Sequence, residues 1–528
     1  MTTNCRIRHK CGVAAVYCGP DMADMEPGGA AGYLQKVLRQ LQHRGEESAG
    51  ITTWRPGRGG QLLDTHRDVG LVSEVFRLSS PVKHESLLRW YAGPAGIGHC
   101  RYATSGTVTR TAAQPFETHG MRTWDWFSFG FNGNLANFAQ LKQELEAAGH
   151  LNLHTDTEIV RHLLWAELGR AKRPDPAAAV AAVAERLDGG YAIVLINADG
   201  DLVAARDPLG LRPLCFGESN GLLAAASESV GLAVIGILEP QPVAPGELIH
   251  IADGRVRRHR FAESQRTAHC FFEWVYFADI GSVIDGVSVY DARYRLGQEL
   301  AKVEPLRDRL DDDFIVVPVP FASKTAADGF AHELGVPLKE GLQCNRYVGR
   351  TFIQSSGREG RAREKYVLLP RILQGKKVLL VEDTIVRGLT LRVLLDRVRE
   401  EGGAAEVHVR VSCPPLISPC PYGIDMTTMD EFIAAQYVDE PAGLQGIAER
   451  VRADMGADSL VYQSYGGLVR SIGLGRDAIC DACITGEYPT LWGAKVRDFA
   501  QRRQGALVGR RSYEAIEEEL REQEIVGR

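Results

Sequence analysis

The sequence of 528 residues lacks several features that would restrict what the protein can be. Its longest apolar stretch, residues 221–238, is broken by Ser227, Glu228 and Ser229, whereas a bilayer span needs roughly 20 predominantly apolar residues. Residues 1–10 are basic, but no apolar segment follows them, so they do not form a secretory signal. These absences predict a cytosolic protein without a membrane span.

The chain also lacks an excess of positive charge. Its 61 Lys and Arg residues face 67 Asp and Glu residues, which gives a formal charge of −6. Nucleic-acid-binding proteins usually carry a basic surface, so nucleic acid is not expected as the main partner. Basic loops in single parts of the chain are still compatible with this net charge. There is no internal repeat or low-complexity tract, and the 45% apolar content is that of an ordinary globular protein.

Eleven cysteines are present. Thiols stay reduced in the cytosol, so we expect these residues to serve packing, catalysis or metal binding instead of a disulfide framework.

The hydrophobic period changes along the chain, and this change predicts two large domains where length alone suggests about three. Up to about residue 260, short apolar strands and amphipathic helices alternate, which predicts an α+β domain with sheets between helices. One helix has Leu34, Val37, Leu38 and Leu41 on one face. The predicted strands are residues 12–17, 96–102, 127–131, 191–196 and 202–205, the last two joined by a hairpin turn at 197–200.

The second half has a different pattern. Strands predicted at 314–320, 377–383 and 406–412 are spaced by helical segments, which indicates βαβ units and a parallel sheet. The helix after Thr390 is expected to end at Gly402 and Gly403. The polar, basic residues 253–269 are predicted to link the halves, and the residues after about 511 to form a charged helix on the surface.

Several motifs of the first half resemble the glutamine amidotransferase domain of the N-terminal-nucleophile hydrolases. They occur in the family's order: LQHRGEESAGI (41–51), GHCRYATSG (98–106), FNGNLAN (131–137), HTDTE (154–158), RDPLGLRPL (206–214), ASES (226–229) and PGELI (245–249). The resemblance implies an αββα sandwich over residues 11–260 and a leader or propeptide of residues 1–10 whose removal exposes Cys11.

A lone cysteine at a strand start is more often a packing residue than a nucleophile, but the surrounding motifs favour catalysis at Cys11. Thiol attack on the amide carbon of glutamine gives a thioester and ammonia. The α-amino group of an amino-terminal cysteine, with a pKa of about 7.7–8.0, can take the thiol proton. The resemblance assigns the oxyanion donors to Asn132 and Gly133, the α-carboxylate of glutamine to Arg101 and its α-ammonium to Asp156. Without the motifs, surface salt bridges would explain Arg101 and Asp156.

KVLLVEDTIVRGLT (377–390) places Glu382 and Asp383 at the end of a buried strand, before a turn and a helix N-terminus. This context suits an anionic sugar phosphate; the alternative is a capped helix after an acidic turn. The segment resembles the phosphoribosyl pyrophosphate (PRPP) motif of type I phosphoribosyltransferases. The resemblance implies an α/β domain over 261–495 with a C-terminal helical tail at 496–528.

Within that motif, Glu382 and Asp383 would contact the ribose hydroxyls or bind Mg²⁺. The residues implied to bind the phosphates are Thr384, Arg387, Gly388 and Thr390. GLQCNRYVGRTFIQ (341–354) resembles the loop that covers PRPP in amidophosphoribosyltransferases. In this loop Arg346 and Arg350 would neutralise pyrophosphate, and Tyr347 would help to close the loop.

The chain departs from the family pattern around the transferase site. Residues 321–324 read Phe-Ala-Ser-Lys, where Lys324 can still bind phosphate as a point charge. Glu382 and Leu389 also differ from the usual residues. These changes leave the identity of the ammonia acceptor open.

Four further cysteines have a distinct setting. Cys480 and Cys483 form a C-x-x-C motif, which alone is ambiguous among zinc, redox and iron–sulfur ligation. With Cys270 and Cys420 they resemble the [4Fe–4S] ligands of the cluster-containing amidophosphoribosyltransferases. Zinc would fit the same ligand set. Either site would tie the domain junction to the C-terminal region.

Over residues 11–495 the resemblance implies an enzyme that uses ammonia from glutamine to displace pyrophosphate from PRPP, giving 5-phosphoribosylamine for purine synthesis. It also implies an internal ammonia tunnel, Mg²⁺, a homotetramer or dimer, and inhibition by purine nucleotides. Two alternatives stay open: a glutaminase that aminates another phosphosugar or nucleotide, and a regulatory protein whose second half only senses PRPP or nucleotides.

Overall fold

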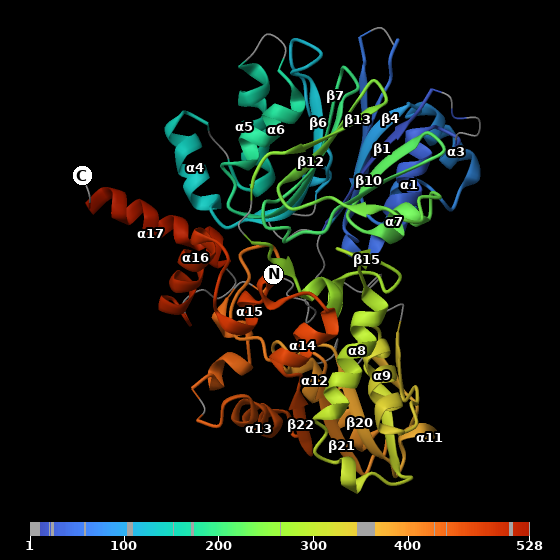
Figure 1. Cartoon of the computed structure of the whole chain (residues 1–528), viewed down its shortest axis with the longest axis vertical. Helices are drawn as coiled ribbons and strands as arrows, with labels where there is room; N and C mark the ends of the chain where they lie inside the picture. Colours follow the sequence, from blue (N-terminus) through green and yellow to red (C-terminus); the bar gives the residue numbers. More distant parts are fainter. Residues whose placement is uncertain are drawn as a thin grey trace.

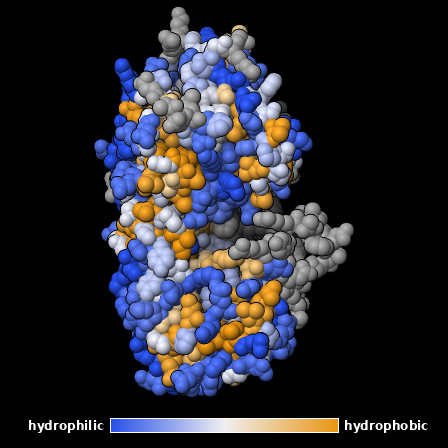
Figure 2. Space-filling view, turned by 90° about the vertical axis from the view of Figure 1, so that its right-hand side faces the viewer, coloured by the Kyte–Doolittle hydropathy of each residue, from blue (hydrophilic) through white to orange (hydrophobic). Residues whose placement is uncertain are grey.

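The computed structural model describes residues 11–20, 22, 26–57, 60–102, 109–150, 153–170, 174–263, 266–345, 365–426, 428–439, 441–505 and 511–526. Within these ranges, no helix combines the length and apolarity that a bilayer span requires. Figure 1 shows two halves, with the amino-terminal half at the top and most of the carboxyl-terminal half below it. On the face in Figure 2, hydrophobic residues occur on both halves in groups between hydrophilic ones, as is usual for folded proteins.

Two sheets form the amino-terminal half, and all their strand pairs are antiparallel. The seven-stranded sheet has the order β11-β9-β10-β1-β4-β2-β3, and the six-stranded sheet has the order β13-β12-β8-β7-β6-β5. The first contains β1 (Gly12–Cys18), β2 (Ser48–Trp54), β3 (Leu63–Val69), β4 (Ala95–Arg101), β9 (Cys215–Ser219), β10 (Leu222–Ala226) and β11 (Gln241–Pro242). The second contains β5 (Phe116–Thr118), β6 (Phe127–Leu135), β7 (Gly189–Asn197), β8 (Leu202–Arg206), β12 (Glu247–Ala252) and β13 (Arg255–Arg260).

Helices cover the outer face of each sheet, which confirms the predicted αββα order (Figure 1). The inner faces meet in one core, where Val13 and Ile97 of the first sheet pack with Val194 of the second. The helices by the first sheet are α1 (Ala30–Gln40), α2 (Val72–Val75), α3 (Pro81–Trp90) and α7 (Ser229–Ala233). Those by the second sheet are α4 (Phe138–Ala147), α5 (Asp156–Gly169) and α6 (Pro176–Ala184).

The predicted hairpin is confirmed as β7 and β8, but the predicted linker is wrong in its middle part. Residues 255–260 form β13, which pairs antiparallel with β12. Asp253 and Gly254, both at positive φ, make the two-residue turn between these strands. The segment looks like a linker in the sequence because most side chains of this edge strand are exposed.

The carboxyl-terminal half has the predicted parallel sheet, in the order β17-β20-β21-β22. Its strands are β17 (Phe314–Pro318), β20 (Lys377–Glu382), β21 (Glu406–Val411) and β22 (Ser459–Tyr462). The main helices are α8 (Val289–Lys302), α9 (Lys324–Leu334), α12 (Leu389–Glu400), α13 (Gly443–Met455) and α14 (Tyr465–Ile472). Shorter elements are β15 (Val283–Ile284), β16 (Val287–Ser288), β18 (Leu342–Cys344), β19 (Tyr366–Leu368), α11 (Pro370–Leu373) and α15 (Ala482–Thr485).

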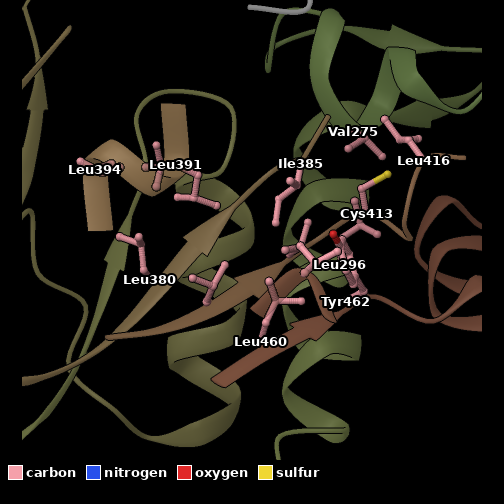
Figure 3. Packing of buried hydrophobic residues seen from close by; sticks show 14 of the residues in the cluster. Val275, Leu296, Leu380, Ile385, Leu391, Leu394, Cys413, Leu416, Leu460 and Tyr462 are labelled. Carbon is pink, nitrogen blue, oxygen red and sulfur yellow. The ribbon is translucent and has the colours of Figure 1, made fainter. Parts of the chain in front are cut away.

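The core of this half reaches the junction with the other half. Figure 3 shows Leu380 of β20, Leu391 of α12 and Leu460 of β22 in one buried cluster. Val275 belongs to the same cluster and lies in the π-helical turn η3 (Glu273–Phe277). The junction also contains β14 (His269–Cys270), which pairs in parallel with β23 (Ile479–Cys480). Apolar packing therefore continues from the parallel sheet to the segment that leads into the domain.

The C-terminal region differs from the prediction. It contains α16 (Leu491–Arg502) and α17 (Ser512–Val526), so the predicted boundary at residue 496 falls inside a helix. Tyr513, Ala515 and Ile516 are buried in the core of the amino-terminal half, and Figure 1 shows α17 beside α4. The many charges of α17 conceal this apolar face in the sequence, so the prediction of a surface helix is only half right.

Candidate functional site

Cys11 lies directly before β1, and the pairing of β1 with β4 brings it close to the end of β4. Gly12 is opposite Cys100 in this ladder, so Arg101 and Tyr102 follow beside Cys11. The Cys11 thiol donates to the Tyr102 carbonyl oxygen at 3.5 Å. Burial raises the pKa of the Cys11 thiol, whereas the Tyr102 contact and the Arg101 charge lower it. The structure therefore brings Cys11 and Arg101 together, as the prediction requires.

Asn132 and Gly133 lie on β6, in the sheet opposite Cys11. Asn132 Nδ2 donates to Ser227 Oγ at 3.4 Å, and Ser227 Oγ also accepts from the Val13 N–H at 3.0 Å. Ser227 thus joins the two sheets next to Cys11. Its ASES motif contributed to the family resemblance, but the sequence did not indicate this bridging role. A Cβ on Gly133 would lie 2.4 Å from the Gly190 carbonyl oxygen, so only glycine fits this position.

Asp156 begins α5 and is 4% exposed. Its Oδ2 accepts from the Leu135 N–H at the end of β6, at 3.0 Å. Its Oδ1 is buried and has no hydrogen-bond partner among the described residues. Burial raises the pKa of this carboxyl to about 7. The predicted glutamine residues therefore converge on the ends of β4 and β6, and Asp156 has an acceptor oxygen left for a ligand.

This pKa predicts how glutamine binding depends on pH. If Asp156 receives the α-ammonium group, binding needs the carboxylate, whose population falls as the pH drops through about 7. In a Cys11→Ala enzyme, which cannot turn glutamine over, the Kd for glutamine should rise roughly tenfold from pH 8 to pH 6. Calorimetric titration measures this. Adding Asp156→Asn to the Cys11→Ala enzyme should make binding weak at every pH, and a Kd of the Cys11→Ala enzyme that stays constant across the range would contradict the assignment.

A buried charge network joins the two halves next to Cys11. Arg44, 1% exposed, donates to Glu228 and to both carboxylate oxygens of Glu273, at 3.0 and 2.9 Å for the latter. Its Nε lies 3.4 Å from the Cys11 carbonyl oxygen. Burial opposes the charged form of Glu228, but His43 and Arg44 outweigh it and lower its pKa. Sequence reasoning missed this network, because nothing in the motifs shows that these charges are buried.

The predicted transferase residues gather where β20 meets α12. Asp383 is buried and its Oδ1 accepts from the Thr384 hydroxyl at 2.9 Å. Burial raises the pKa of Asp383. The hydrogen bond from Thr384 and the charges of Lys365 and Arg293 lower it, but by less. Gly388 has a φ of 74° before the first residue of α12, a conformation that glycine adopts without strain. Carboxylate, hydroxyl and helix N-terminus thus lie together, as predicted.

Two predicted phosphate-binding cations have protein partners in this structure. Lys324, the first residue of α9, forms an ion pair with Glu340 at 2.5 Å. Arg387 pairs with Glu431. Both pairs are partly exposed, so an anionic ligand can compete for the cations. Arg346, Tyr347 and Arg350 lie outside the described residues.

The four predicted ligand cysteines line one cavity at the junction. Cys270, Cys420, Cys480 and Cys483 all line this cavity, together with Arg212 and Tyr488. Burial raises the pKa of Cys270 to about 12 and that of Cys480 and Cys483 well above the usual range, and the neighbouring thiols add to the effect. Among the described residues, no group of three or more His, Cys, Asp or Glu is arranged to hold a single metal ion.

A buried cation also lines this cavity. Arg212 is 1% exposed, and its Nε has no hydrogen-bond partner in the described part of the chain. Its charge acts against the burial that raises the pKa of Cys270 and Cys420. The cavity therefore combines four thiols with the Arg212 guanidinium, whose Nη1 lies 3.6 Å from Glu273 Oε1.

Comparisons with known proteins cover both halves. The profile of the glutamine amidotransferase domain matches residues 99–233, and that of the phosphoribosyl transferase domain matches residues 295–433. The amidophosphoribosyltransferase of Methanothermobacter thermautotrophicus is 38% identical over 507 residues, which are 94% of this chain and 98% of the relative. The chain belongs to the amidophosphoribosyltransferase family. The Bacillus subtilis member is 37% identical over 460 residues, 86% of this chain and 90% of its own.

Solved structures agree with this membership. The glutamine PRPP amidotransferase from B. subtilis, complexed with ADP and GMP, matches with a TM-score of 0.77 at 35% identity, covering 91% of this chain and 97% of its own. A structure described as the allosteric regulatory enzyme of purine biosynthesis matches with a TM-score of 0.78, also at 35% identity, covering 91% of this chain and 96% of its own. As in other amidophosphoribosyltransferases, a glutamine amidotransferase domain is thus joined to a phosphoribosyltransferase domain with a parallel sheet.

Proposed function

We infer that this chain transfers the amide nitrogen of glutamine to PRPP and releases 5-phosphoribosylamine, pyrophosphate and glutamate, the first step of purine synthesis. The observation that carries this inference is the pairing, in one chain, of the Cys11 and Arg101 site with the Asp383 and Thr384 loop. Family membership over nearly the whole chain supports the same reaction.

In the amino-terminal half, the α-amino group of Cys11 takes the thiol proton, the sulfur attacks the amide carbon of glutamine, and ammonia leaves with that proton. Water then hydrolyses the thioester, which releases glutamate and restores the thiol. The role of the α-amino group requires removal of residues 1–10. Asn132 and the N–H of Gly133 stabilise the oxyanion. Arg101 and Asp156 hold the carboxylate and ammonium groups of the substrate, for which the free Oδ1 of Asp156 is the strongest support.

In the transferase half, Glu382 and Asp383 bind the ribose hydroxyls and would hold Mg²⁺, which supplies positive charge to the departing pyrophosphate. Carboxylate oxygens at the end of a buried strand are suitable ligands for this ion. The turn with Thr384, Arg387, Gly388 and Thr390 binds the 5-phosphate through backbone N–H groups and the N-terminus of α12. Ammonia travels between the sites inside the protein, where it stays unprotonated.

We also propose that Cys270, Cys420, Cys480 and Cys483 bind a [4Fe–4S] cluster. Their shared cavity and the buried Arg212 support this assignment, because a cluster with four thiolate ligands is anionic. When bound, the cluster would tie together three segments, those of Cys270, of Cys420 and of Cys480 with Cys483, and its role is structural. Zinc is the alternative occupant.

Replacing Cys480 by Ser tests the cluster. Protein purified without oxygen should contain about four iron and four sulfide per chain, and Cys480→Ser should lose most of both. The matched control is Cys344→Ser, which removes a half-buried thiol outside the cavity and should keep the full content. Metal and sulfide analysis measures the result. Stoichiometric zinc without sulfide would contradict the cluster.

One assay tests the main reaction. Glutamine consumption should be accompanied by pyrophosphate release only when PRPP and Mg²⁺ are both supplied. Glutaminase activity without pyrophosphate release would favour a different acceptor, a candidate supported by Phe321, Leu389 and the Lys324–Glu340 pair. Binding of PRPP without turnover would favour a regulatory protein.

Further properties follow from family membership and are proposals for this chain. They are inhibition by purine nucleotides, in keeping with the ADP and GMP bound to the B. subtilis enzyme, assembly into a homotetramer or dimer, and a cytosolic location. Addition of GMP or ADP to the pyrophosphate assay tests the first.

A further inference from the structure

Ser227 holds the start of the strand that follows Cys11. It comes directly after β10, where the ladder of β10 with β1 ends at the pair Ala226 and Ala14. Its N–H donates to the Val13 carbonyl oxygen at 3.0 Å, and its Oγ accepts from the Val13 N–H at 3.0 Å. The side chain thus supplies the acceptor that a backbone carbonyl would supply if the ladder continued. Because Val13 is two residues from Cys11, these bonds fix the strand that carries the candidate nucleophile.

The same hydroxyl oxygen also holds the Asn132 side chain. A serine hydroxyl has two acceptor sites, and Asn132 Nδ2 donates to Ser227 Oγ at 3.4 Å. Asn132 is 0% exposed, and its Oδ1 has no hydrogen-bond partner in the part of the chain that the structure describes. The bond to Ser227 is therefore what orients this carboxamide among the described residues. The amide nitrogen carries two hydrogens, so a second N–H is left for a ligand.

The backbone around Asn132 is held by other contacts. The neighbouring Phe131 N–H donates to Gln114 Oε1 at 2.8 Å, and His99 Nε2 donates to the Phe131 carbonyl oxygen at 3.1 Å. Asn132 itself lies inside the ladder of β6 with β7. Loss of the Ser227 hydroxyl would thus leave the strand in place and free the carboxamide to rotate.

We propose that Ser227 is a positioning residue for the glutaminase reaction: it aims the Asn132 carboxamide at the oxyanion that forms when Cys11 attacks glutamine. The proposal rests on the proposed oxyanion role of Asn132. A carboxamide turned by half a rotation presents its oxygen to the oxyanion, and the two negative atoms repel each other. Ser227 does not touch the substrate in this role.

The Ser227→Ala enzyme tests the proposal in the assay of glutamine-dependent pyrophosphate release. Removing one oxyanion donor lowers kcat by about 10²–10³-fold, so misdirecting that donor should lower kcat by about tenfold. The KM for glutamine should stay within about twofold, because ground-state binding is unaffected. Ser227→Cys, whose thiol occupies a similar space but accepts hydrogen bonds weakly, should show the same split. Release driven by ammonium chloride should be unchanged in both variants, which shows that they are folded.

Alkylation of Cys11 by iodoacetamide separates the nucleophile from the oxyanion. In this reaction the sulfur displaces iodide from a CH₂ carbon, and no oxyanion forms. Mass spectrometry of the Cys11 peptide should therefore give the same alkylation rate in Ser227→Ala as in the parent. An alkylation rate that falls together with kcat would place the effect on the nucleophile strand and overturn the proposal. A raised KM at normal kcat, or unchanged kinetics, would overturn it as well.

Ser128→Ala is the matched control. Ser128 lies on the same strand as Asn132, four residues earlier and so roughly 13 Å away. Its Oγ shares a hydrogen bond of 2.7 Å with Thr52 Oγ1 of the other sheet. The variant also removes a buried hydroxyl between the two sheets, but it should leave kcat and KM for glutamine unchanged. A loss equal to that of Ser227→Ala would assign the effect to sheet packing and overturn the proposal.

A double variant separates the proposal from the proposed function. If Ser227 acts through Asn132, adding Ser227→Ala to Asn132→Ala should lower kcat no further. Losses that multiply would show independent actions and overturn the proposal while the role of Asn132 stands. If Asn132→Ala alone keeps its kcat, the oxyanion role in the proposed function fails, and the role of Ser227 fails with it.

Discussion

The Cys11→Ala enzyme is expected to lose glutamine-dependent pyrophosphate release by roughly 10⁴-fold or more, because no other group can form the thioester. Release driven by added ammonium salt should stay within about twofold, because free ammonia then reaches the transferase site without the glutaminase. The two sites lie in separate halves with separate cores. Parallel pyrophosphate assays with glutamine and with ammonium chloride measure both rates.

Cys100→Ala is the matched control for this prediction. Cys100 lies opposite Gly12 in the same sheet and its thiol donates to the Leu41 carbonyl oxygen. Burial raises its pKa to about 12, so it stays a neutral thiol. Its replacement should leave both reactions nearly intact. A folded Cys11→Ala enzyme without either activity would contradict two independent sites, and one that keeps the glutamine reaction would place the nucleophile elsewhere.

Replacing Arg44 by Met should cause a large loss of stability at the junction. The substitution leaves Glu228 with His43 alone and Glu273 with only the more distant Arg212, at 3.6 Å, although their side chains are 0% and 2% exposed. Breaking a buried ion pair in this way costs about 3–5 kcal/mol. The midpoint of urea unfolding, followed by circular dichroism, should fall accordingly. Glutamine turnover should fall too, because Arg44 also lies against the Cys11 carbonyl oxygen.

Arg89→Met serves as its control. Arg89 pairs with Glu85 on α3, where the two side chains are 74% and 57% exposed, and such a pair contributes at most about 1 kcal/mol. Its loss should hardly move the unfolding midpoint. The double variant Arg44→Met and Glu273→Gln should be less destabilised than the sum of its single variants, because it removes one stranded charge. Equal midpoints for Arg44→Met and Arg89→Met would contradict the importance of the buried network.

Local patterns in the sequence were sufficient for most of the fold. Alternating and continuous apolar strands, the turn at 197–200 and the helical stripe from Leu34 to Leu41 each act over a few residues, and all are found in the structure. The parallel sheet followed from strands spaced by helices. The Asp253-Gly254 turn carried an equally local signal for β13, but the surrounding arginines suggested a solvated linker instead.

The remaining features depend on contacts between distant residues. Whether Arg44 is a surface cation or a buried one is decided by Glu228 and Glu273, far along the chain. Ser227 becomes a bridge only because the two sheets stack. The apolar residues of α17 are too few to mark a buried helix until the core that receives them is known. The order of the motifs was enough to predict which residues form the candidate site. The burial and pairing of its charges could be known only from the three-dimensional structure.

The pairing of β14 with β23 has a consequence for biosynthesis. As the chain leaves the ribosome, His269 and Cys270 emerge long before Ile479 and Cys480, their partners in the two-stranded pair. Both globular halves can acquire most of their structure while this joint is still open, and long-range pairing of this kind forms slowly. Chains released before residue 479 would lack the closing strand, two of the four thiols and the α17 residues that are buried in the amino-terminal core. Premature termination should therefore yield a protein with an unsecured joint and an incomplete amino-terminal core.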